Sequence, residues 1–209
     1  MRDPVDRASR DPGTFQLRNW VLGVVSLWIL QGCAAVALHP PEGPKDPVTV
    51  ALLDHGHHSS LVLPAKAAGA WVRYSYGDWA FYVERRMNPL MGFAGLFLPT
   101  KGALGRQVLT GPGLAGVAEQ QLRVPLEESF PLVVTRERAT ALREELEDIW
   151  HGGYDERAES RAWDMTFAEH PEAYTLLNNS NRMVANWLMA LEIEVSRVPL
   201  LSNWQVGSP

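Results

Sequence analysis

Residues 48–64 read VTVALLDHGHHSSLVLP, and this stretch decides the fold class of the chain. Val48, Val50 and Leu52 alternate with Thr49 and Ala51, which is the pattern of a β-strand. A second β-branched and apolar run, Ser60 to Leu63, follows after a polar turn. The stretch therefore predicts two neighbouring strands joined through a histidine-rich turn.

Further strands are predicted around two more turns. Trp71 to Tyr76 and Phe81 to Glu84 are aromatic runs that flank a Gly-Asp turn. Gln107 to Thr110 and Gln121 to Leu126 flank a glycine-rich turn. Between these pairs, Met87 to Gly105 mixes glycine and proline with apolar residues, which predicts a short apolar helix inside an irregular insertion.

Two helices are predicted after the strands. Thr135 is suited to cap a helix that ends at Gly152, because apolar residues recur at helical spacing between them: Leu142, Leu146, Ile149 and Trp150. A terminal helix should begin near Ser180, where a polar run gives way to a second apolar stripe. This order predicts an α+β fold in which an antiparallel sheet packs against helices.

The composition is that of an ordinary globular domain. Apolar residues make up 46% and charged residues 21% of the 209 residues. One α+β domain over residues 48–209 accounts for the length. The net charge of −5 provides no basic field for a phosphate backbone, so nucleic acid is not expected as a partner.

Residues 1–33 have the character of a membrane-targeting segment. The run from Trp20 to Leu38 is apolar and uncharged, and Leu30 to Cys33 resembles the lipobox at which bacterial lipoproteins are cleaved and lipidated. An uncleaved signal anchor is the alternative, because the run is long enough to span a membrane. Either predicts a domain in the bacterial envelope, facing the periplasm or the exterior, on a Pro-rich tether over 34–47. A lipidated Cys33 would sort to the outer membrane in a Gram-negative host.

Cys33 is the only cysteine of the chain. A structural disulfide, a thiolate metal cluster and a cysteine nucleophile inside the domain are therefore excluded. Nothing in the sequence predicts a cofactor.

The turn Asp54 to His58 holds three imidazoles and a carboxylate within five residues. Imidazole titrates near neutral pH and serves as a general base or as a metal ligand. The other candidate ligands stand at no recognised spacing, so no metal site is assigned: His151, His170, Asp78 and Asp164. For His55 and His57 a solvated polar turn is the favoured interpretation, whereas His58 adjoins the strand.

Three motifs resemble a bacterial lipoprotein family of unknown function, itself similar to a circularly permuted branch of the papain-like NlpC superfamily. They are His58 with the strand Ser59 to Pro64, Tyr76-Gly77-Asp78 with Phe81-Tyr82, and Asn178-Asn179-Ser180-Asn181 at a helix start. The family patterns are Gly-x-His-Thr, Gly-Asp-x-x-Phe-Tyr and Asn-x-Cys-Asn. The resemblance spans residues 48 to 195 and implies a papain-like α+β fold with histidine first and nucleophile last.

Ser180 departs from this pattern, because it stands where the family has cysteine. The resemblance implies His58 as base, Asp78 as the residue that orients it, and Ser180 as the degenerate nucleophile. A serine hydroxyl must lose its proton to a base during attack, whereas a thiol at a helix start ionises readily. Helix capping is the alternative role for Ser180. Three further residues are candidates for ligand binding: Asn179, Asn181 and Trp79.

Three functions remain open from the sequence. The first is a degenerate papain-like domain that binds a peptide, glycan or lipid of the cell wall or membrane. The second is an active serine hydrolase or acyltransferase that uses Ser180 and His58. The third is a structural lipoprotein whose histidine turn binds a divalent metal.

Overall fold

The structure, a computed structural model, describes residues 35–85, 98–111, 113–114, 120–152, 157–199 and 201–207. The targeting segment 1–33 with Cys33, and residues 86–97 of the insertion predicted from Met87 to Gly105, lie outside the described residues. The rest of that prediction is wrong, because Thr100 to Gly105 belong to the strand β5 (Thr100–Thr110). Within the described ranges, every helix is too short or too polar to cross a bilayer.

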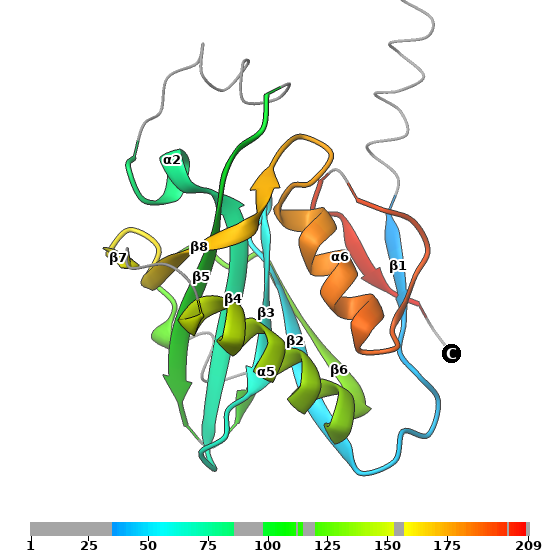
Figure 1. Cartoon of the computed structure of the whole chain (residues 1–209). Helices are drawn as coiled ribbons and strands as arrows, with labels where there is room; N and C mark the ends of the chain where they lie inside the picture. The colour runs from blue at the N-terminus through cyan, green and yellow to red at the C-terminus, as the bar shows by residue number, and fades with distance from the viewer. Residues whose placement is uncertain are drawn as a thin grey trace, which may run out of the picture. The chain divides into compact units, whose positions relative to one another are not determined.

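A seven-stranded sheet forms the centre of the fold, with strand order β6-β2-β3-β4-β5-β8-β7 (Figure 1). Every neighbouring pair in this sheet is antiparallel. The strands are β2 (Pro47–Asp54), β3 (Ser59–Pro64), β4 (Ala70–Asp78), β5 (Thr100–Thr110), β6 (Glu128–Thr135), β7 (Arg157–Ser160) and β8 (Met165–Tyr174). The predicted antiparallel α+β class and the hairpin around the histidine turn are confirmed.

Two long helices, α5 (Arg136–His151) and α6 (Ser180–Ala190), cover one face of this sheet (Figure 1). The Thr135 hydroxyl accepts a hydrogen bond from the Arg138 amide at 3.3 Å, and α5 ends at Gly152, as predicted. The start of the second helix at Ser180 is also confirmed.

Strand alternation builds an apolar core on each face of the sheet. Leu61 and Leu63 of β3 pack in one cluster with Val184 and Leu188 of α6. Val62, between them, belongs to a second cluster on the opposite face, whose other buried members are Ala51, Leu53, Leu109 and Leu114. A one-residue slip of β3 would exchange these two sets, so burial on both faces fixes its register.

A separate three-stranded sheet consists of β1 (Val36–His39), β9 (Glu194–Val195) and β10 (Trp204–Val206). β1 runs parallel to β10 and antiparallel to β9. Residues 36–39 were predicted to be tether, yet Val36 and Leu38 are buried in the main core. The compact unit accordingly starts at residue 35 rather than near residue 48.

Two predicted strands are wrong. Residues 79–82 form the short helix α2 (Trp79–Tyr82), because Asp78 accepts a hydrogen bond from the Phe81 amide and starts a helical turn. The segment after Gln121 is not a strand either. Its sequence is apolar enough for a strand, but the Gln121 side chain binds the main chain of Thr110 instead.

Candidate functional site

The predicted site residues gather at one end of the large sheet. Because adjacent strands are antiparallel, β3 and β5 begin where β4 and β8 end. The chain then turns from the end of β8 into the start of α6 (Figure 1). His58, Asp78 and Ser180 therefore lie at this same end, which we call the histidine end.

Two asparagines stabilise the first turn of α6, and one of them binds it to the start of β3. Asn179 caps the helix by accepting a hydrogen bond from the Arg182 amide at 2.9 Å. Asn181 accepts from the Ser59 hydroxyl at 3.1 Å and donates to the His57 carbonyl at 3.3 Å. Both predicted binding residues thus hold the helix in place, and Asn179 takes the capping role that was considered for Ser180.

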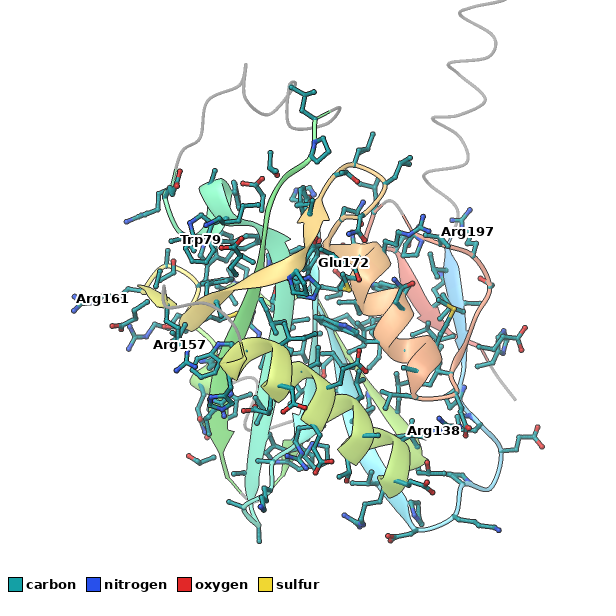
Figure 2. All side chains as sticks on the ribbon, viewed as in Figure 1. Trp79, Arg138, Arg157, Arg161, Glu172 and Arg197 are labelled. Carbon is teal, nitrogen blue, oxygen red and sulfur yellow. The ribbon has the colours of Figure 1, made fainter. Side chains whose placement is uncertain are left out.

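Ser180 is the first residue of α6 and is 6% exposed. Its neighbourhood includes the loop from β8, where the Asn178 side chain donates to the Tyr76 hydroxyl at 3.4 Å. The Tyr76 hydroxyl in turn donates to the Glu172 carbonyl at 3.1 Å. Figure 2 shows Glu172 next to the beginning of this helix. The helix start is therefore surrounded by amide, hydroxyl and carbonyl groups.

The His58 ring lies in a cluster of rings. It stacks on His55 with ring centroids 4.8 Å apart, and it meets the edges of Trp163 at 5.3 Å and of Tyr82 at 6.1 Å. Burial, and then the charge of Arg73, lowers the pKa of His58 to about 4. The imidazole is therefore neutral near pH 7.

His58 and Ser180 make no hydrogen bond with each other among the described residues. Tyr82 and Trp163, which contact the His58 ring, pack with Phe167 in a cluster separate from the core under α6. The structure thus brings the main chain next to His58 against α6, while the ring itself packs elsewhere.

Asp78 is also engaged by other partners. One carboxylate oxygen accepts from the Phe81 amide at 2.8 Å, and the other accepts from the Thr100 hydroxyl. Within the described chain it makes no hydrogen bond to His58. Trp79, the next residue, is buried, and the Lys101 ammonium lies 5.1 Å from the centre of its ring.

A buried network that the sequence analysis missed supports the histidine turn from the other side. His55 donates from Nδ1 to the Pro125 carbonyl at 2.7 Å, so its Nε2 must accept. Nε2 accepts from the Ser60 hydroxyl at 3.0 Å and from the Arg73 guanidinium at 3.2 Å. Arg73 also donates to Ser60 and to Gln107.

Arg73 is 1% exposed, and its burial lowers its pKa to about 10. Burial, together with this cation, lowers the pKa of His55 to about 3. His55 is therefore a structural acceptor and not part of a solvated turn. The sequence did contain a signal for this network, because Arg73 is a charged residue inside the predicted strand from Trp71 to Tyr76. A charge that is buried in a strand must have hydrogen-bonding partners.

His170 is a second buried imidazole at this end, whereas His58 is half-buried. Its ring lies 4.9 Å from that of Tyr76, and its Nδ1 accepts from the Glu172 amide at 3.0 Å. Burial lowers its pKa. In the part of the chain that the structure describes, no group of three or more histidine, cysteine or acidic side chains is arranged to hold a metal ion.

Comparisons of the chain with protein-family models, with curated proteins and with solved structures found no match.

Proposed function

We propose that the chain is an envelope-anchored domain, related to the permuted papain-like branch, that binds a ligand at its histidine end without hydrolysing it. The observation that carries the proposal is the packing of His58, whose ring stacks on His55 and makes no hydrogen bond with Ser180 among the described residues. A serine hydroxyl is a weak nucleophile unless a base takes its proton. Without such a base, attack by Ser180 would be slow.

The protonation of His58 supports the same conclusion. A general base works best when its pKa lies near the working pH. The pKa of His58, about 4, is well below this range because the ring is buried close to Arg73. Proton transfer from a serine hydroxyl to such an imidazole would be strongly uphill.

The groups at the histidine end favour a peptide or a glycan over a lipid chain. Asn178 and Thr100 are half-buried and have amide and hydroxyl groups there, and the Phe81 ring is 38% exposed. Polar groups beside an exposed ring suit a peptide or a sugar, whereas an acyl chain needs a continuous apolar surface.

A thiol placed at position 180 tests the proposal directly. Ser180→Cys and the double variant Ser180→Cys/His58→Ala, both with Cys33→Ser, are alkylated by iodoacetamide across pH 5 to 10. The helix start alone lowers the thiol pKa in both variants. We expect the two pH–rate profiles to coincide. A pKa at least one unit lower when His58 is present would reveal a working pair and overturn the proposal.

Fluorophosphonate labelling of the natural chain is the complementary measurement. We expect no label on Ser180 in folded protein. Labelling that disappears in both Ser180→Ala and His58→Ala would instead establish the serine hydrolase.

The envelope anchor is tested separately in a bacterial host. Growth with an alkyne-tagged fatty acid should label the chain, and Cys33→Ser should abolish the label. A chain that stays in the membrane fraction without label would favour the uncleaved anchor over the lipoprotein.

A further inference from the structure

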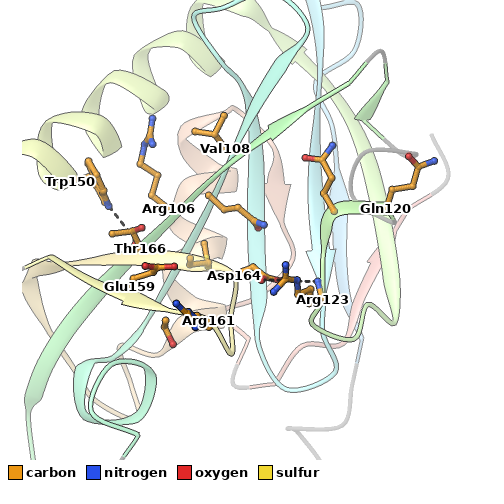
Figure 3. A pocket seen from close by; sticks show the side chains of 13 residues that line it. Arg106, Val108, Gln120, Arg123, Trp150, Glu159, Arg161, Asp164 and Thr166 are labelled. Atoms are coloured by element: carbon orange, nitrogen blue, oxygen red, sulfur yellow. Dashed lines mark hydrogen bonds and ion pairs between the residues drawn. The ribbon is translucent and has the colours of Figure 1, made fainter.

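A polar pocket of about 840 Å³ lies along the side of β5, away from the histidine end of that strand (Figure 3). Its wall combines the last part of β5 with residues 120–123, the end of α5 and the turn between β7 and β8. Val108, Trp150 and Met165 give it apolar surface, and glutamine, threonine and charged side chains give it hydrogen-bonding groups.

The pocket occupies the place where the sheet stops short. β4 pairs with β5 as far as Thr110, but on the other side β8 pairs with β5 only as far as Arg106, opposite Thr166. Among the described residues, 107–110 thus have no partner strand on the β8 side. An open strand side of this kind is a template for another extended chain.

Gln121 already binds this open side as a strand residue would. Its side-chain amide donates to the Thr110 carbonyl and accepts from the Thr110 amide. Thr110 therefore directs its main-chain groups away from β4. Because alternate residues of a central strand face the same neighbour, Val108 directs its N–H and C=O in this direction too. Val108 lines the pocket and is 49% exposed.

The charges of the pocket differ in sign from those of the whole chain. Three arginines and two acidic residues line it, whereas the chain carries a net charge of −5. Arg106 is paired with Glu147, and the Arg123 side chain, paired with Asp164, is still 80% exposed. Arg161 and Glu159 are both exposed and make no ion pair among the described residues. The exposed charges of the rim are therefore two arginines, Arg123 and Arg161, against one glutamate, which favours an acidic ligand.

We propose that this pocket binds an extended acidic peptide segment that adds a short strand to β5 at Val108. The main-chain groups of Val108 supply the central hydrogen bonds, and Arg123 and Arg161 attract the acidic side chains. The pocket meets the network behind the histidine turn at Gln107, which accepts from Arg73. The variants used below leave Gln107 unchanged, so their outcome does not depend on the function proposed above.

The test uses a fluorescein-labelled peptide of about eight residues that alternates valine and glutamate, and follows anisotropy at low salt. Val108→Pro removes one main-chain donor that does not face β4, and we expect it to weaken binding at least about tenfold, whereas Val108→Ala should bind within about threefold of the natural chain. Arg161→Glu should weaken binding and reduce its salt dependence.

Two N-methylated peptides test the same pairing with the natural chain, so this test does not depend on whether Val108→Pro folds. Methyl groups on one edge of the peptide block its pairing with β5, and methyl groups on the other edge do not. We expect only one of the two to bind, and the bound natural peptide to slow hydrogen exchange at the Val108 amide. The proposal would be overturned if no saturable binding were seen, or if both methylated peptides bound equally well. It would also be overturned if a scrambled acidic peptide bound equally well to Val108→Pro.

Discussion

Lowering the pH from 7 to 5 should weaken the fold, because His55 and His58 are held neutral in it. Their pKa values are about 3 and about 4 in the folded chain, owing first to burial and then to Arg73. In the unfolded chain each returns to about 6.5. A folded-state pKa below the unfolded value means that the unfolded chain binds the extra protons. The fold is therefore fully stable above about pH 6.5 and loses stability as the pH falls toward 4.

The size of the effect follows from these two shifts. Each histidine should remove about 2 kcal/mol of unfolding free energy between pH 7 and pH 5, or about 4 kcal/mol together. Burial of His170 lowers its pKa as well and acts in the same direction. Since small domains are stable by only about 5–15 kcal/mol, the loss is easily measured.

Urea unfolding at several pH values between 7 and 5 provides the assay. His55→Asn keeps a donor for the Pro125 carbonyl but removes one titrating group, so its loss over this range should fall by about half. If the unfolding free energy did not change from pH 7 to pH 5, the conclusion that both rings are held neutral in the folded chain would be refuted.

Two further predictions concern packing and capping. Gly77→Ala should destabilise the fold by about 1–3 kcal/mol in urea unfolding, because the new Cβ would lie 2.0 Å from the Tyr82 ring, while Gly113→Ala meets nothing within 4 Å and should be neutral. Asn179→Ala should cost about 1 kcal/mol by removing the cap of α6, and Ser180→Ala should cost less than half of that; the reverse order would show that Ser180 is the cap.

Local sequence patterns correctly predicted the elements that can be recognised from neighbouring residues alone. The alternation around Val50 and the capped stripe after Thr135 need only neighbouring residues to be recognised, and both appear at the predicted places as β2 and α5. The Gly-Asp turn was misread because a capping aspartate and a turn aspartate look alike in sequence. The aromatic residues after Asp78 then favoured a strand, although the cap starts α2.

The candidate site was only partly predictable for a related reason. The family resemblance implied that His58 and Ser180 meet, and Asn181 does bind the segment next to His58. It could not indicate the direction of the His58 ring. That direction depends on Trp163 and Tyr82, which follow 105 and 24 positions later, and on a stack with His55. Side-chain orientation at the end of a strand is set by such distant partners.

The pairing of β1 with β10 determines when β1 can fold during synthesis. Val36 lies opposite Trp204, which is made 168 positions later. Until that residue emerges, β1 has no parallel neighbour, and the apolar side chains of Val36 and Leu38 lack part of their cover. Contacts so distant in sequence form slowly, because a long loop must close first. A chain that stops short of Trp204 should therefore be more open to proteases.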